Sequence, residues 1–177
     1  RPPFPVTEGL YKKPTVVNNV ETLAAAAGIL LNGSEKFSAI GNKKSAGTKL
    51  VCFDSFFNNP GVYEIEMGTP MKKVLYDIGG GFKEDIKALQ IGGPLGGVIP
   101  IAEAEKLNLD FQEFTTAGFM LGHASIVSIP KDFPMVEYIH HLFEFTAEES
   151  CGKCFPGRIG SYRGKEMFDQ LKSKKAK

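Results

Sequence analysis

The chain has 177 residues, of which 42% are hydrophobic and 23% are charged, and its formal net charge is +1. This length is enough for one sizeable domain or two small ones, and the apolar content is ordinary for a globular protein that buries a core. The balanced charge does not favour nucleic acid or an anionic membrane as a partner, and no apolar run approaches the roughly 18 residues of a membrane span. The chain shows no signal-peptide pattern and opens at Arg1 without an initiator Met, so we expect a segment of a longer protein.

The first part of the chain predicts an extended arm and then a helix. Residues 1–17 hold four of the eleven prolines and few helix signals. A helix is expected from Asn18, whose side chain can cap the first turn in a capping-box arrangement with Glu21. Apolar residues then recur at helical spacing up to Leu31, and Gly33 ends the helix.

The middle of the chain predicts a small sheet crossed by one helix. The expected elements, in chain order, are strands at 50–53 and 62–66, a helix at 71–78, and strands at 86–91 and 97–100. The turn Asn58–Gly61 should join the first two strands as a hairpin. A hairpin, a crossing helix and further strands follow one another in this order in a β-grasp domain. The expected fold class is therefore α+β.

The last part of the chain predicts mainly helices. Residues 101–132 are expected to be a connecting segment with a short helical piece at 111–117 and a strand at 124–129. A helix should begin at Pro134 and run to about Glu148, and a last helix is expected at 159–172, before a basic tail.

Cys151 and Cys154 stand three residues apart in the stretch SCGKCFPGR, residues 150–158. Two thiolates at this spacing, beside a helix end, can point at one metal, and nearby basic residues would offset their charge. Two cysteines are only half of a four-ligand site. Three interpretations therefore stay open: an incomplete cluster ligand pair, a structural or adventitious pair, and a redox dithiol. A zinc site completed by a second copy of the chain is a fourth and weaker one.

The remaining motifs indicate no independent active site, so no catalytic residue is expected. Cys52 lies in an apolar, strand-like run and is expected to be a buried structural thiol. The run Gly92–Gly97 lacks the Lys-Ser/Thr pair of a phosphate-binding loop and is expected to reverse the chain between strands. None of the three histidines is expected to be a ligand or a base.

Four stretches carry a family resemblance. They are KPTVVNNVETLA (13–24), NNPGVYEIEMGTP (58–70), QIGGPLGG (90–97) and ESCGKCFPGR (149–158). In this order they resemble the C-terminal part of the NADH-binding flavoprotein subunit of respiratory complex I. The same type of subunit occurs in NAD(P)-reducing hydrogenases and NAD-dependent formate dehydrogenases.

The resemblance implies a longer protein that takes hydride from NADH onto FMN and passes single electrons to a [4Fe–4S] cluster. Asn18, Asn19 and Thr22 would contact FMN, although a helix cap is a sufficient role for them in this chain alone. The implied domains are the end of the flavin domain (1–47), a soluble-ligand-binding β-grasp domain (48–100), a connection (101–132) and the start of a helical iron–sulfur domain (133–177). The implied partners are other subunits of an NADH-linked redox complex in the cytoplasm, which meets a membrane only through the larger complex.

One departure from the family pattern limits what this segment can bind. The family run is Cys-Gly-Lys-Cys-x-Pro-Cys-Arg, and Gly157 stands where the third cysteine belongs. Glycine has no donor atom, and the family's fourth cysteine comes further downstream, so we expect no cofactor on this segment alone. The segment is expected to be a non-catalytic structural and interaction module. The alternative is a stand-alone ligand-binding or partner-binding β-grasp module with a vestigial cysteine pair.

Overall fold

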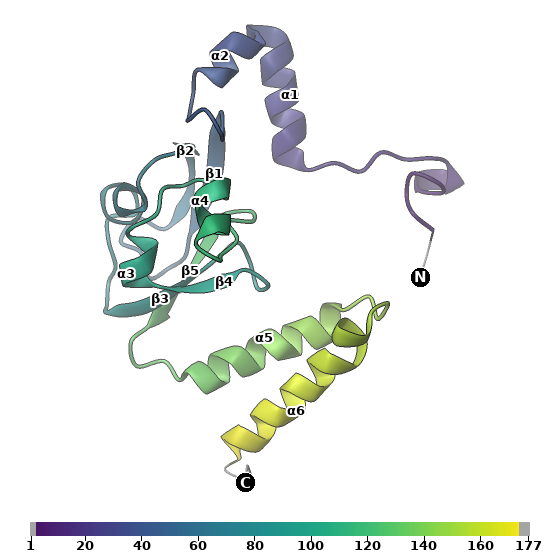
Figure 1. The fold of residues 1–177 in the computed structure, drawn as a ribbon, viewed down its shortest axis with the longest axis vertical. Helices are drawn as coiled ribbons and strands as arrows, with labels where there is room; N and C mark the ends of the chain where they lie inside the picture. Colours follow the sequence, from purple (N-terminus) through teal and green to yellow (C-terminus); the bar gives the residue numbers. More distant parts are fainter. Residues whose placement is uncertain (1–2, 174–177) are drawn as a thin grey trace. The chain divides into compact units, whose positions relative to one another are not determined.

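A computed structural model describes residues 3–173 and divides the chain into two units, Arg1–Ser38 and Ala39–Lys177 (Figure 1). The end of the predicted basic tail, residues 174–177, lies outside the described residues. Within the described part, no helix is both long enough and apolar enough to cross a lipid bilayer.

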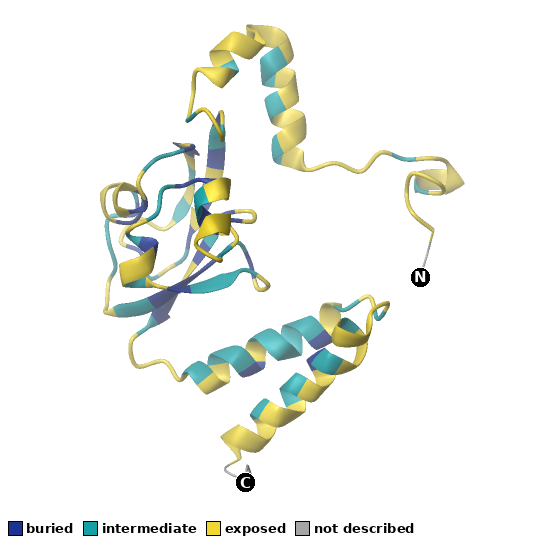
Figure 2. Ribbon diagram, in the orientation of Figure 1, coloured by how far each residue is buried: buried dark blue, intermediate teal, exposed yellow. Residues whose placement is uncertain are grey.

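The first unit is built from short helices without a core. It contains a 3-10 turn, η1 (Leu10–Lys12), and the helices α1 (Val20–Asn32) and α2 (Ser34–Ser38). The predicted helix is therefore present, but its expected cap is wrong. The cap is Asn19, whose side chain accepts hydrogen bonds from the amides of Glu21 and Thr22. No described residue of this unit is buried (Figure 2).

The second unit contains a five-stranded mixed sheet with the strand order β2-β1-β5-β3-β4. Its strands are β1 (Thr48–Phe53), β2 (Gly61–Glu66), β3 (Ile86–Ile91), β4 (Gly97–Pro100) and β5 (Ser125–Pro130). Neighbouring strands are antiparallel except β1 and β5, which run parallel. The five predicted strands, the first hairpin and the α+β class are confirmed. The narrower β-grasp assignment stays a prediction that this strand order is compatible with.

The strand β5 lies in the middle of the sheet. It pairs with β1 through Cys52 opposite Ser125, and with β3 through Gln90 opposite Val127. It comes from residues 101–132, which we expected to be a connection between domains. We therefore propose that the sheet domain extends to Pro130 rather than ending at residue 100.

The core of the second unit lies on one face of the sheet. Alternate residues of β1, such as Val51 and Phe53, point into it, as the two-residue period of a strand requires. The most deeply buried side chains include Phe57, Leu75 and Leu89, each with 0% exposure. Further elements that border the core are the helices α3 (Ile101–Ala104) and α4 (Phe111–Thr116).

The segment between β2 and β3 is helical, but not a regular α-helix. It starts with an α-helical turn at Met71 and continues as a π-helix, η2 (Lys73–Ile78). The amide of Gly79 bonds the carbonyl of Val74, five residues earlier, at 3.0 Å. The sequence predicts the helix here, and the structure corrects its type.

Two long helices follow the sheet. The helix α5 (Met135–Glu149) meets β3 where the hydroxyl of Tyr138 donates to Gln90 Oε1. The chain then turns and returns through a π-helical turn, η3 (Pro156–Gly160), and the helix α6 (Ser161–Lys172), which packs along α5 (Figure 1). Both helices are predicted, with the second one starting later. Residues 88–91 of β3 are buried in succession because the core covers one face and α5 meets the other.

Candidate functional site: the cysteine turn between α5 and α6

The turn that joins α5 to α6 carries the cysteine pair. Ser150 leaves the helical conformation with φ −62° and ψ 128°, and the chain becomes helical again at Phe155. Gly152 has φ +68°, a left-handed conformation that favours glycine, and its amide donates to Ser150 Oγ at 3.2 Å. Cys151 and Cys154 are exposed free thiols on this turn.

Position 157 faces the second of these cysteines. A Cβ atom placed on Gly157 would lie 3.3 Å from Cys154 Sγ and 2.8 Å from Ser150 Oγ. A side chain at this position would therefore occupy the space beside the Cys154 thiol. The structure thus brings positions 154 and 157 of the run together, and position 157 contributes no donor atom.

Aromatic packing holds the two helices together near the turn. The rings of Phe143 on α5 and Phe168 on α6 stack with their centroids 5.5 Å apart. Gly164 lets α6 approach closely, because a Cβ atom there would lie only 2.3 Å from the Phe143 ring. The close approach of α5 and α6 therefore depends on the missing side chain at position 164.

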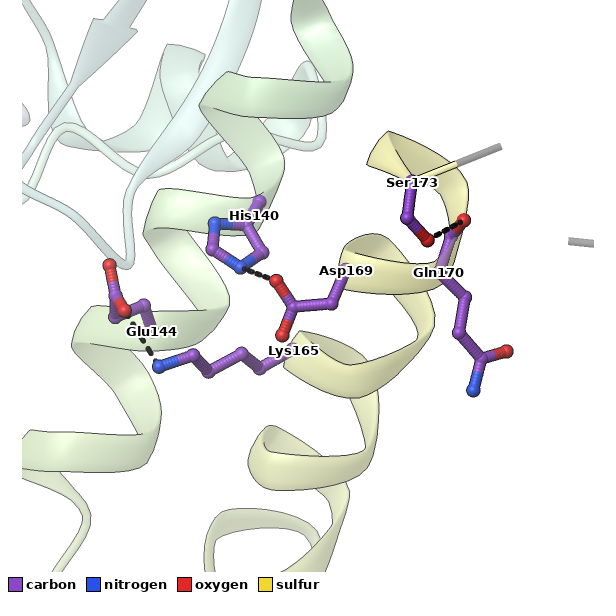
Figure 3. A network of polar contacts seen from close by, with 6 residues as sticks. All are labelled: His140, Glu144, Lys165, Asp169, Gln170 and Ser173. Carbon is purple, nitrogen blue, oxygen red and sulfur yellow. Dashed lines mark hydrogen bonds and ion pairs between the residues drawn. The ribbon is translucent and has the colours of Figure 1, made fainter. Parts of the chain in front are cut away.

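Polar contacts continue this packing along the same two helices (Figure 3). Lys165 Nζ donates to Glu144 Oε1 at 2.6 Å, and the hydrogen bond and charge of Lys165 lower the pKa of Glu144. The same hydrogen bond raises the pKa of Lys165. His140 is buried with its Nε2 atom 2.8 Å from Asp169 Oδ1. His140 therefore faces α6 and not the cysteine turn.

The residues expected to contact FMN lie together at the start of α1. Asn19 Oδ1 accepts from the amide of Glu21 at 2.8 Å and from that of Thr22 at 3.4 Å, while Asn18 Oδ1 accepts from the Asn19 amide at 3.1 Å. Asn18, Asn19 and Thr22 are exposed. These bonds give Asn19 a structural role, and the FMN contacts stay a prediction.

The prediction that Cys52 is buried is wrong, because Cys52 is exposed. Its strand neighbours Val51 and Phe53 point into the core, so the side chain between them points to the opposite face of the sheet. Its cross-strand neighbour Val62 is also exposed, at 64%. By contrast, the prediction for Gly92–Gly97 is confirmed, since this run reverses the chain between the antiparallel strands β3 and β4.

Comparison with known proteins identifies relatives along nearly the whole chain. Residues 137–177 match the NADH-ubiquinone oxidoreductase-F iron-sulfur binding region. The chain is 38% identical to the NADP-reducing hydrogenase subunit HndC of Solidesulfovibrio fructosivorans, over 97% of this chain and 35% of the relative. It is 42% identical to the F-type subunit of NADH-quinone oxidoreductase of Escherichia coli (strain K12), over 90% of this chain and 36% of the relative. The fold matches a chain of an air-oxidized NAD+-reducing [NiFe]-hydrogenase with a TM-score of 0.82 and 33% identity, covering 98% of this chain and 29% of that chain.

The chain is homologous to one part of these subunits. The resemblance inferred from the four sequence motifs is thereby confirmed. The chain spans about a third of the length of the curated relatives named above. The homology therefore covers a segment, and the activity of the whole subunit is a matter for proposal.

The matched iron–sulfur region allows its expected cofactor to be tested against the donors present. A [4Fe–4S] cluster is normally held by four thiolates. The run supplies Cys151 and Cys154, while Gly157 places a position without a donor beside the Cys154 thiol. Among residues 3–173 no group of three or more His, Cys, Asp or Glu side chains could hold a metal ion. The described residues thus do not fit a four-thiolate cluster.

One pocket was not anticipated from the sequence. A hollow of about 600 Å³ lies in the second unit. It is lined by Lys44, Ser45, Ala46, Thr48, Met67, Phe111 and Gln112. Beside it, the buried Asp110 caps α4 and accepts from Asn42 Nδ2 at 2.8 Å. Three distant stretches of chain form this wall, so no local sequence pattern marks it.

Proposed function

We propose that this chain is a segment of an NADH-oxidising flavoprotein subunit, in which it is a structural and interaction module and not the catalytic part. The observation that carries the proposal is the match over nearly the whole chain, in both sequence and fold, to subunits of an NADP-reducing and an NAD+-reducing hydrogenase. The match to the F-type subunit of NADH-quinone oxidoreductase supports the same conclusion.

The proposed substrate of the longer protein is NADH, and the cofactors that the family resemblance implies for it are FMN and a [4Fe–4S] cluster. This segment contributes two thiolates of the cluster run, and we derive no electron-transfer step through it because the third thiolate is replaced by Gly157. The proposed partners are other subunits of an NADH-linked redox complex. Free, exposed thiols at Cys151 and Cys154 favour a reducing compartment such as the cytoplasm.

The exposed apolar side chains of α1 support the view that the longer protein covers them. Val20 is 80% exposed, Leu30 88% and Leu31 85%. Apolar side chains that recur along a helix normally pack against another element, because their burial stabilises the fold by about 1.5–3 kcal/mol each. We propose that the remainder of the flavin domain packs on this helix.

The test compares the protein encoded by the complete reading frame with the 177-residue segment, each purified through an affinity tag. The complete protein should release about one FMN per chain on acid treatment and should oxidise NADH with ferricyanide as acceptor, while the segment should do neither. An Asn18→Ala variant of the complete protein should lose FMN, and Thr22→Val should do the same. Asn19→Asp keeps the helix cap and is the matched control for folding. A complete protein without flavin would contradict the proposal.

The alternative, a ligand-binding β-grasp module without a redox role, is favoured by one observation, the pocket lined by Lys44 and Phe111. A mixed polar and apolar lining of this kind suits a small molecule. A library of small anionic metabolites should then raise the melting temperature of the segment, and Gln112→Ala should abolish the rise. No stabilisation by any compound would remove this alternative.

A further inference from the structure

Two glycines of the cysteine run have different physical reasons to be glycine. Gly152 adopts φ +68°, which side chains rarely tolerate, so the backbone of the turn requires glycine there. Gly157 has no left-handed φ and lies inside the helical turn η3. The conformation of the backbone therefore does not require glycine at position 157.

The space around position 157 also admits a side chain. The closest atom to its Cβ position, at 2.8 Å, is the hydroxyl oxygen of Ser150, which sits at the end of a short rotatable side chain. The next is Cys154 Sγ, at 3.3 Å, and no backbone atom is among the nearest three. Rotation of Ser150 about χ1 gives up only its 3.2 Å hydrogen bond with the Gly152 amide. A residue larger than glycine can therefore be accommodated without moving the helices.

The turn is held by contacts that do not involve the cysteines. The stacked rings of Phe143 and Phe168 and the Lys165–Glu144 ion pair join α5 to α6. The geometry of the turn is therefore set before any metal binds, and the run differs from a three-thiolate site in its donor inventory and not in its shape.

We propose that residues 150–158 form a preorganised two-thiolate site whose only local defect is the missing sulfur at position 157, so that Gly157→Cys alone converts it into a three-thiolate iron–sulfur site. The disagreement between the matched iron–sulfur region and the donors present is then a change of chemistry on an intact scaffold. The proposal rests on the match at residues 137–177 and the local geometry, and not on NADH oxidation.

The experiment is anaerobic reconstitution of the 177-residue chain with ferrous iron and sulfide. An excess of 2-mercaptoethanol supplies an external thiolate for the remaining iron. Three proteins are compared after gel filtration: the wild type, Gly157→Cys, and Gly157→Ala, which adds the same Cβ without sulfur. Iron and sulfide per chain, visible absorbance and the electron paramagnetic resonance spectrum of the reduced sample are measured. Far-UV circular dichroism and thiol titration show that each protein is folded and carries the intended thiols.

Gly157→Cys should retain about three to four irons with matching sulfide, while the wild type and Gly157→Ala should retain less than about half an iron per chain. Equal loading of the wild type and Gly157→Cys would overturn the proposal, because another donor would already complete the site. If that loading disappears in Ser150→Ala, the donor is the Ser150 hydroxyl. Failure of a folded Gly157→Cys protein to retain iron would also overturn it, since a further local defect would then exist. Neither outcome depends on flavin or on NADH turnover, so each is distinguishable from failure of the proposed function.

Discussion

The close contact at Gly164 leads to a prediction about how α5 and α6 are held together. Gly160 and Gly164 lie one turn apart on the same continuous helical stretch. A Cβ atom on Gly160 would meet nothing closer than Pro156 Cβ at 4.0 Å, which is ordinary contact. On Gly164 it would lie 2.3 Å from two atoms of the Phe143 ring. The same substitution, glycine to alanine, should therefore have different effects at the two positions.

The magnitude follows from two opposing contributions. Alanine is favoured over glycine inside a helix by about 1 kcal/mol, and this gain applies at both positions. Overpacking at the helix contact costs about 1–3 kcal/mol, and it applies only at position 164. Gly160→Ala should thus stabilise the protein slightly. Gly164→Ala should be less stable than Gly160→Ala by about 1–3 kcal/mol, because the propensity gain cancels in the comparison.

Urea unfolding followed by far-UV circular dichroism measures the global effect. Hydrogen exchange of peptides from α5 and α6 measures local opening if the helices unfold before the sheet. In a Phe143→Ala background the ring is absent, so Gly164→Ala should become as favourable as Gly160→Ala. The double-mutant cycle should then give a coupling free energy of about 1–3 kcal/mol. A coupling below about 0.5 kcal/mol would show that the helices do not pack through this contact, and the account of how the cysteine turn is held would fail.

Three further predictions concern the core, the first unit and pH. Phe57→Ala should lower the free energy of unfolding by about 3–5 kcal/mol in urea titrations, because Phe57 is fully buried between Phe53 and Phe82, whereas Phe155→Ala, at an exposed site, should change it by less than about 0.5 kcal/mol. Deletion of residues 1–38 should leave the urea midpoint of the remaining chain unchanged, because every buried hydrophobic residue in the described part of the chain follows position 38; a large decrease would contradict the division into two units. The lowered pKa of Glu144 adds stability that is present at neutral pH and is lost as the pH falls through it, below about 4, so Glu144→Gln should reduce the acid dependence of unfolding there; an unchanged dependence would show that the pair with Lys165 contributes nothing.

The sequence predicted the secondary structure well because its signals are local. Each strand of the sheet has a glycine or a proline at or next to at least one of its ends, and the buried stripe of α5 recurs at helical spacing. The π-helical type of η2 was not predictable, since it depends on an amide of Gly79 reaching back five residues in a turn packed on the core. The central position of β5 depends on pairing between residues 125–130 and strands far away in the chain, which no local pattern records.

The error at Cys52 has a specific cause. Leu50–Phe53 is apolar at every position, so the alternation that tells the two faces of a strand apart is absent from the sequence. The core takes Val51 and Phe53, and the remaining two residues are exposed on the other face. The same loss of alternation in β3 has the opposite outcome, because α5 meets its second face. Which of these outcomes occurs is decided by a helix more than forty residues further along the chain.

The cysteine turn shows why a ligand set can change while its scaffold persists. In a site that folds only around its metal, loss of one donor removes the energy that orders the loop. Here the turn lies at the end of two helices joined by stacked aromatic rings and an ion pair, and its left-handed residue is a glycine. None of these features depends on a donor at position 157. Replacement of a thiolate by hydrogen at this position therefore alters what the turn can bind and leaves its conformation, which explains how a chain that matches an iron–sulfur region can carry an incomplete set of ligands.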